Sequence, residues 1–254
     1  MNVLAFFAHP DDETMLCGGT LALLAGQGAQ VDVLIATRGE GGEMGEPPLC
    51  TRAELGAVRE AELRCAVQVL GGRLLLMDYL DPVVGPDNTL YPFTEDFDAL
   101  IEQVMQAVRE TRADVLLAHG VNGEYGHPAH KLAHQAAWRA VQNLGAEAPL
   151  FYTIQGHFAD HPYPRLANAD APAHLVLDVT PVLAQKTAAA LCHRTQHNLF
   201  VRHRSEQAGR QLSVPETVMA LESVTRAWPA VEDGVPTDPF TSLLLASGQA
   251  RRPA

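Results

Sequence analysis

Hydrophobic residues follow two alternating spacings along the chain. Unbroken apolar runs are typical of strands buried on both faces, and apolar residues three or four positions apart are typical of amphipathic helices. The first pattern predicts strands at residues 3–8, 31–37, 74–77, 114–118, 150–155 and 174–179. The second pattern predicts helices at residues 14–27, 49–70, 95–112, 127–144 and 180–200.

This alternation of strands and helices predicts the fold class. Strands separated by helices are typical of βαβ units, in which helices cover both faces of a parallel sheet. We therefore expect an α/β, Rossmann-like three-layer sandwich with a mainly parallel central sheet. We expect one domain over residues 1–254, with a core at about 1–200 and a C-terminal elaboration at about 201–254. Residues 155–172 and 214–254 are predicted to be rich in loops.

Composition and charge narrow the classes of partner. The 254 residues are 47% hydrophobic and 19% charged, which is typical of a globular protein, and the net charge of -12 argues against binding to nucleic acid. The first apolar run has no basic leader and is too short to cross a bilayer, so we expect a cytoplasmic protein without a membrane partner. The four cysteines match no metal motif, and we expect them to be reduced thiols.

Three polar clusters follow predicted strands, at residues 9–13 (HPDDE), 37–42 (TRGEGG) and 119–134 (HGVNGEYGHPAHKLAH). Ligands of open parallel sheets bind beyond the carboxyl ends of the strands, so the fold would bring these clusters to one edge. Imidazole and carboxylate groups are common ligands of zinc and similar cations. His9, Asp12 and one histidine of the third cluster could hold such a cation, which would leave Asp11 free to take a proton from water.

A simpler interpretation stays open for each cluster. Acidic residues after a strand can decorate a helix N-terminus, where they are favourable without any ligand. His127 and His130 can likewise be solvated residues of a first helical turn. Glu13 is expected to be a helix-start residue without a part in the chemistry.

Two motifs carry a resemblance to a known family. Residues 8–13 (AHPDDE) follow the first strand, and residues 125–130 (YGHPAH) come much later in the chain. Together they resemble the LmbE-like, or PIG-L, family of metal-dependent N-deacetylases. Residues 37–42, the Arg59-Glu60 pair and residues 186–196 (KTAAALCHRTQ) are similar to further family features.

The resemblance implies a role for each matching residue. It makes His9, Asp12 and His130 the metal ligands, with Zn²⁺ as the usual ion and Fe²⁺ or Mn²⁺ as alternatives. Asp11 would be the general base that activates the attacking water. His127 would stabilise the oxyanion or protonate the leaving amine, and Tyr125 would help to polarise the substrate carbonyl.

The chain departs from the family pattern at Ala129, where many members have an aspartate that orients the histidine two positions earlier. His127 therefore needs another partner, or its pKa will be low. Arg59 is expected to bind substrate at the edge of the pocket. Glu40 and Asp81 are weaker candidates for substrate contacts.

Three further histidines have alternative interpretations. His134, one helical turn after His130, could replace it as a ligand. His119 is expected either near the ligands or in the core. His193 is expected to be a packed helical residue.

These features predict a metal-dependent hydrolase that removes an acetyl or other acyl group from the amide nitrogen of an N-acetylglucosaminyl-type small molecule. An amidase of thiol–sugar conjugates and a non-catalytic metal- or sugar-binding domain are the alternatives. The expected partner is a small amino-sugar conjugate, and self-association is left open.

Overall fold

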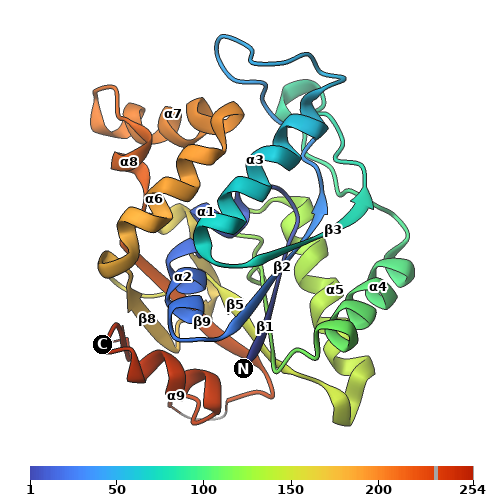
Figure 1. Cartoon of the computed structure of the whole chain (residues 1–254), viewed down its shortest axis with the longest axis vertical. Helices are drawn as coiled ribbons and strands as arrows, with labels where there is room; N and C mark the ends of the chain where they lie inside the picture. The colour runs from blue at the N-terminus through green and yellow to red at the C-terminus, as the bar shows by residue number, and fades with distance from the viewer. Residues whose placement is uncertain (232–233, 254) are drawn as a thin grey trace.

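A computed structural model describes residues 1–231 and 234–253 of the chain. Over these residues the central sheet has eight strands in the spatial order β10-β8-β9-β5-β4-β1-β2-β3, and β6 pairs with β7 in a separate two-stranded sheet (Figure 1). The strands are β1 Asn2–Phe7, β2 Gln30–Thr37, β3 Arg73–Tyr79, β4 Val115–Ala118, β5 Leu150–Ile154, β6 Gly156–His157, β7 Asn168–Pro172, β8 Leu175–Asp178, β9 Leu221–Trp228 and β10 Ala250–Arg251. Strands β1 to β5 run parallel, and β9, β8 and β10 add antiparallel pairs at one side. The predicted mainly parallel α/β sheet is confirmed.

Helices cover both faces of this sheet. The α-helices are α1 Asp12–Met15, α2 Gly18–Gly26, α3 Leu55–Leu70, α4 Phe97–Thr111, α5 Pro128–Leu144, α6 Leu183–Cys192, α7 His197–Ala208, α8 Val214–Thr217 and α9 Pro239–Ala246. The 3₁₀ turns are η1 Pro86–Asn88, η2 Gly145–Glu147, η3 Pro164–Leu166, η4 Thr180–Val182 and η5 Arg194–Gln196. Among the described residues, no helix combines the length and the apolar character needed to span a membrane.

Strand β1 shows why the molecule has three layers. Successive side chains of a strand point to opposite faces. Val3, Ala5 and Phe7 belong to the core beneath α2, α3 and α6, whereas Leu4 and Phe6 belong to the core beneath α4 and α5. Both faces of the strand are therefore dry, which explains its unbroken apolar run.

Two predicted helices are each divided in the structure. The helix predicted at residues 14–27 is α1 followed by α2, with a break at Cys17. The helix predicted at residues 180–200 is divided near His193, between α6 and α7. Both breaks occur beside the polar clusters, where the chain changes direction so that polar side chains can be buried together.

Residues 214–254 differ most from the prediction. They were expected to be rich in loops, but they contain β9, an interior strand that lies between β5 and β8. The strand was missed because its polar residues, such as Glu222, interrupt the apolar pattern. This C-terminal segment therefore helps to complete the main sheet.

The prediction of four reduced cysteines is wrong for two of them. Cys65 of α3 and Cys192 of α6 form a disulfide across 127 residues of sequence, and their Cα atoms lie 5.8 Å apart. Cys17 and Cys50 are free. Helices α3 and α6 pack side by side, a contact that cysteine spacing alone does not reveal.

A buried ion pair ties β9 to the helices of one face. The Glu222 carboxylate accepts hydrogen bonds from the backbone N–H groups of Gly19 and Thr20, at 2.8 and 2.7 Å. The Lys186 Nζ lies 2.7 Å from the same carboxylate, and both side chains are fully buried. Burial removes both charges from water, so each depends on the opposite charge of the other, and hydrogen bonds from the backbone add to the compensation of Glu222.

Removal of one partner should therefore be costly. We predict that Lys186→Met lowers the free energy of unfolding by about 3–5 kcal/mol, because Glu222 keeps a buried and unpaired charge. Urea denaturation measures this loss. The matched control Arg64→Met breaks an exposed i,i+4 pair with Glu60 and should change stability by about 0.5 kcal/mol or less. Equal losses of unfolding free energy in the two variants would contradict the stabilising role of the buried Lys186–Glu222 pair.

Candidate metal centre and active site

The parallel strands bring the three polar clusters to one edge of the sheet. β1 leads directly into His9, β2 leads into the glycine-rich loop at 39–42, and β4 ends one residue before His119. β1 lies between β2 and β4, so the segments that follow these three strands are neighbours. The expectation that residues from distant segments share this edge is confirmed by the strand order.

His9, Asp12 and His130 form one compact group of possible metal ligands. The Asp12 carboxylate lies between the two imidazoles, with Oδ2 3.4 Å from Nδ1 of His9 and Oδ1 3.3 Å from Nε2 of His130. All three residues are buried. His130 is held by the first turn of α5, which begins at Pro128, where proline costs no hydrogen bond.

A second carboxylate orients each histidine from behind. Asp81 Oδ1 lies 3.4 Å from Nε2 of His9, and Glu124 Oε2 accepts a hydrogen bond from Nδ1–H of His130 at 2.8 Å. One nitrogen of each imidazole thus faces Asp12. The other nitrogen faces an outer carboxylate, which is Asp81 for His9 and Glu124 for His130. This outer ring of carboxylates is the usual arrangement around histidines that bind a metal.

Glu124 was missed in the sequence, although it lies inside the third cluster. Besides His130, its buried carboxylate accepts hydrogen bonds from His119 Nδ1, the Gly120 N–H and Asn168 Nδ2. Burial raises the pKa of Glu124, but the adjacent His119 and His130 hold it well below its usual range. An acidic residue between two histidines of a strand-end loop was the available signal.

Neither alternative histidine belongs to the group formed by His9, Asp12 and His130. His119 adjoins this group, with Nε2 3.4 Å from Asp12 Oδ2 and its ring stacked on that of His130. The Ala8 N–H donates to Nε2 of His119 at 3.1 Å, so this nitrogen is already used as an acceptor. His134 donates from Nδ1 to the His119 carbonyl at 2.9 Å and packs against Phe151. His119 is fully buried and His134 is half-buried, and both have partners of their own.

The donor set fits a divalent cation. Nε2 of His130 is buried and has no hydrogen-bond partner, although it points at Asp12. A buried polar atom without a partner is costly, and a cation between the two groups would satisfy it. Two imidazoles and one carboxylate, backed by outer carboxylates, suit zinc and also iron or manganese.

Protons compete with a cation for these ligands. Burial lowers the pKa of His9, but Asp12 and Asp81 outweigh burial and raise it to about 9. The pKa of Asp12 is raised by burial, yet His130 and His119 hold it well below its usual range. The electrostatic field of the Asp12 and Asp81 carboxylates therefore favours a positive charge beside Asp12.

Asp11 has an unusual backbone conformation beside the ligand group. Its φ of 102° lies in the left-handed region, which non-glycine residues rarely adopt. Its side chain lines the cavity, with Oδ2 3.2 Å from Nη2 of Arg59. Burial raises the pKa of Asp11 to about 6, against the lowering effect of Arg59.

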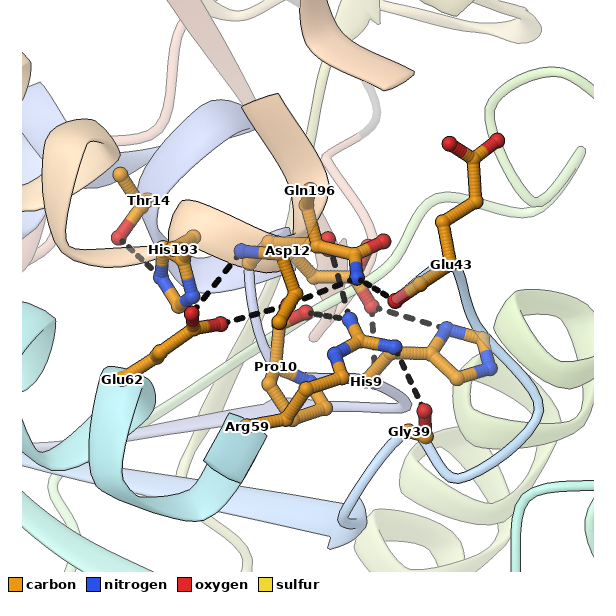
Figure 2. Close-up of polar contacts among 12 residues, drawn as sticks. His9, Pro10, Asp12, Thr14, Gly39, Glu43, Arg59, Glu62, His193 and Gln196 are labelled. Carbon is orange, nitrogen blue, oxygen red and sulfur yellow. Dashed lines mark hydrogen bonds and ion pairs between the residues drawn. The ribbon is translucent and has the colours of Figure 1, made fainter. Parts of the chain in front are cut away.

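Glu13 supports this conformation and is more than a helix-start residue. It is fully buried, and its Oε2 accepts a hydrogen bond from the Asp11 N–H at 2.9 Å. Its Oε1 lies 2.9 Å from Nε2 of His193, which also approaches Thr14 (Figure 2). His193 was expected to be only a packed helical residue. It contacts the Glu13 carboxylate, which in turn accepts the hydrogen bond from the Asp11 backbone.

Arg59 lies deeper than predicted. Figure 2 shows its guanidinium against Gly39 and Pro10, whose carbonyls accept hydrogen bonds at 2.8 and 2.6 Å. A side chain at Gly39 would collide with this guanidinium, so the glycine makes room for it. Arg59 joins the loops after β1 and β2 and contacts Asp11 from the cavity wall.

The two weaker candidates for substrate contacts differ in position. Asp81 lines the cavity beside His9. Glu40 is not among the described residues that line the cavity, and its Oε2 instead accepts a hydrogen bond from the Asp81 N–H at 3.1 Å. Glu40 therefore supports the loop that carries Asp81.

His127 and Tyr125 lie over the ligand group. The His127 ring stacks on His130 with centroids 4.6 Å apart, and the Tyr125 ring meets His130 edge-on at 5.4 Å. The Ala129 N–H donates to Nδ1 of His127 at 3.2 Å. Burial, with the charges of His9 and His130, lowers the pKa of His127 to about 2. Burial thus shifts the pKa of His127 in the direction expected from the departure at Ala129.

These groups open into a cavity of about 900 Å³. His9, Asp11, Asp12, Tyr125 and His127 line it together with residues of α7 and of the loops after β2 and β3. The candidate metal centre is therefore reachable from solvent through a large pocket.

The chain resembles known proteins over most of its length. The family model "PIG-L: GlcNAc-PI de-N-acetylase" matches residues 4–141. A 1D-myo-inositol 2-acetamido-2-deoxy-alpha-D-glucopyranoside deacetylase from Thermobispora bispora is 32% identical over 239 residues, which cover 77% of this chain and 79% of that protein. The protein of the same name from Rhodococcus erythropolis is 30% identical and covers 95% and 97%. The chain belongs to the PIG-L family.

Solved structures confirm the fold. The 4-carboxy-2-hydroxymuconate hydratase GalB from Pseudomonas putida matches with a TM-score of 0.61 and 22% identity, covering 92% of this chain and 99% of that one. Its name describes a different reaction. The activity of this chain must therefore be argued from the site.

The outer carboxylate Glu124 should control metal affinity. We predict that Glu124→Gln weakens binding of Zn²⁺ about 10–100-fold, because His130 loses the carboxylate that orients it and increases its basicity. Competition with a chromophoric chelator measures the affinity. Glu147→Gln, at an exposed glutamate on the 3₁₀ turn after α5, is the control and should bind as the wild type does. Unchanged affinity in Glu124→Gln would contradict the role.

Proposed function

We propose that the protein is a metal-dependent N-deacetylase of small amino-sugar conjugates of the N-acetylglucosaminyl type. The observation that carries the proposal is Asp11, a partly buried carboxylate held in a left-handed conformation beside the ligand group but outside it. A site that only bound metal or sugar would not need this extra base. The names of the relatives in the family support the substrate class.

His9, Asp12 and His130 would hold the cation, and zinc is the proposed ion. When bound, a divalent cation polarises the substrate carbonyl and makes water more acidic. The chain itself supplies the orientation of the ligands through Asp81 and Glu124. The proposed place of action is the cytoplasm.

Asp11 acts as the general base. Its carboxylate takes a proton from the water that attacks the amide carbon, so that a C–O bond forms. It then gives this proton to the amide nitrogen as the C–N bond breaks, and the products are an amine and acetate. Arg59 keeps the carboxylate directed into the cavity through their 3.2 Å contact.

His127 acts as a neutral hydrogen-bond donor. Its Nδ1 accepts from the Ala129 N–H, so its proton is on Nε2. With a pKa of about 2 it is uncharged at neutral pH, and it stabilises the oxyanion without protonating the amine. The proton for the leaving amine therefore comes from Asp11. Tyr125, exposed at the same wall, helps to hold the substrate carbonyl.

The activity can be tested directly. Zn²⁺-loaded protein, incubated with a panel of N-acetylglucosaminides, should release acetate, measured by an enzyme-coupled assay. Asp11→Asn should lower kcat by about 10²–10⁴-fold while the bound metal, measured by elemental analysis, stays unchanged. Asp78→Asn, at an exposed carboxylate, is the matched control. Metal-loaded protein that releases no acetate from any member of the panel would overturn the proposal.

The role of Asp11 as the general base also predicts how kcat/KM depends on pH. Asp11 must be ionised to accept a proton, so kcat/KM should rise with pH through its pKa and level off above it. That pKa is about 6 without a cation, and a bound cation favours the carboxylate, so the acidic limb should lie at or below pH 6. Profiles of kcat/KM between pH 4.5 and 8 measure it. A limb centred at about pH 8 would point to another base.

A further inference from the structure

Exposed apolar side chains gather at the cavity. Half of the large hydrophobic residues that are well exposed in the described part of the chain line it, namely Val83, Val84, Tyr91, Tyr125 and Leu199. Clustered apolar surface in water is unfavourable and typically marks a binding site. The metal centre and its neighbouring polar groups occupy the deep part of the site, so this surface needs another explanation.

We define the apolar rim as Val83, Val84, Tyr91, Leu199 and Phe200. The first three come from the connection between β3 and α4, and the last two come from α7. Val83, Val84, Tyr91 and Leu199 are 57%, 44%, 42% and 47% exposed. More than a hundred residues of sequence separate the two segments, yet both line the same cavity.

Two charged side chains of the loop after β2, Arg52 and Glu43, are already paired near the rim. Arg52 donates to the carbonyls of Glu40 and Gly42 at 2.7 and 2.6 Å. Both oxygens of the Glu43 carboxylate accept hydrogen bonds from Arg202, at 2.7 and 2.8 Å. These side chains shape the loop after β2. They are therefore poorly placed to recognise the many hydroxyls of a polyol.

The size of the cavity also exceeds what one sugar needs. Pockets for drug-sized ligands span about 300–1,000 Å³, and this cavity of about 900 Å³ lies near the upper end. A single N-acetylated sugar ring at the metal centre would leave much of that space unfilled. The remaining space includes the apolar rim.

We propose that the apolar rim is a subsite for an alkyl or aryl group carried by the amide substrate. The proposal rests on the N-deacetylase function and extends it to a substrate class. The same apolar chemistry could come from the aglycone of the sugar or from the acyl group, and the assay separates these sources. The subsite is one that the inositol-containing names of the relatives do not describe.

An anionic substituent is the competing occupant. Arg165 lies with its guanidinium carbon 5.7 Å from the Tyr125 ring centroid, and Arg204 lies 4.7 Å from that of Tyr163. Both arginines line the cavity. Their guanidinium groups face aromatic rings, whereas the rim presents exposed aliphatic carbon, so the apolar group is the better match.

The first test compares substrates on Zn²⁺-loaded wild-type protein. The substrates are the methyl, octyl and carboxymethyl glycosides of N-acetylglucosamine, together with N-octanoylglucosamine. Each methylene removed from water strengthens binding about fourfold, so the octyl glycoside or the N-octanoyl compound should exceed the methyl glycoside at least about tenfold in kcat/KM. Equal values, or the highest value for the carboxymethyl glycoside, would overturn the apolar subsite.

Variants of the rim assign the preference to these residues. The preferred substrate is whichever of the octyl glycoside and N-octanoylglucosamine has the higher kcat/KM with the wild type. The double variant Val84→Ser/Leu199→Ser should reduce the ratio of its kcat/KM to that of the methyl glycoside at least about fivefold, because both side chains lose apolar surface. Leu245→Ser, at an exposed leucine of α9 that does not line the cavity, should keep the wild-type ratio. A ratio that is unchanged in the double variant would contradict the role of the rim.

A binding measurement separates the subsite from the activity. Octyl β-glucoside has no amide, and below its micelle-forming concentration it should bind at least about tenfold more tightly than methyl β-glucoside by calorimetry. Octyl binding without hydrolysis of any amide would overturn the deacetylase function and keep the subsite. Hydrolysis of the methyl glycoside, with neither tighter octyl binding nor a preference for N-octanoylglucosamine, would overturn the subsite and keep the function.

Discussion

The geometry of the candidate metal centre depends on one buried negative charge, the carboxylate of Asp12. Asp12 is the first residue of α1, just after β1, and it is buried and surrounded by the imidazoles of His9, His119 and His130. Burial of a charge costs several kcal/mol unless other groups compensate it. The surrounding histidines, and the cation that the donor set fits, supply that compensation.

Compensation continues outward through a second layer of carboxylates. Glu124 holds two histidines at once, and Asp81 faces the third. On the other side, Glu13 holds the backbone of Asp11, and His193 from the end of α6 holds Glu13. Carboxylates and histidines thus alternate through much of the site, and the geometry of Asp11 follows from its neighbours Glu13 and Arg59.

Much of the core and of the inner site could be predicted. Strands such as β1 and β2 have unbroken apolar runs because both faces are dry, and their carboxyl ends place His9 and the glycine-rich loop at one edge. Strand β9 could not be predicted, because the buried Glu222 breaks its pattern and is explained only by Lys186 from another helix. The disulfide was missed for the same reason, since it depends on the packing of α3 against α6.

The amino-acid sequence by itself determined the class of fold, the family motifs and the residue types that can bind a metal, because these depend on local periodicity and on short spacings. Only the tertiary structure decided what Glu124, Glu13 and His193 do, and that apolar side chains from two distant segments line one cavity. Their partners lie far away along the chain or, as for Glu124, in a loop whose conformation local spacing does not specify. Hydrogen bonds and apolar contacts act over a few ångströms in space, whatever the distance in sequence.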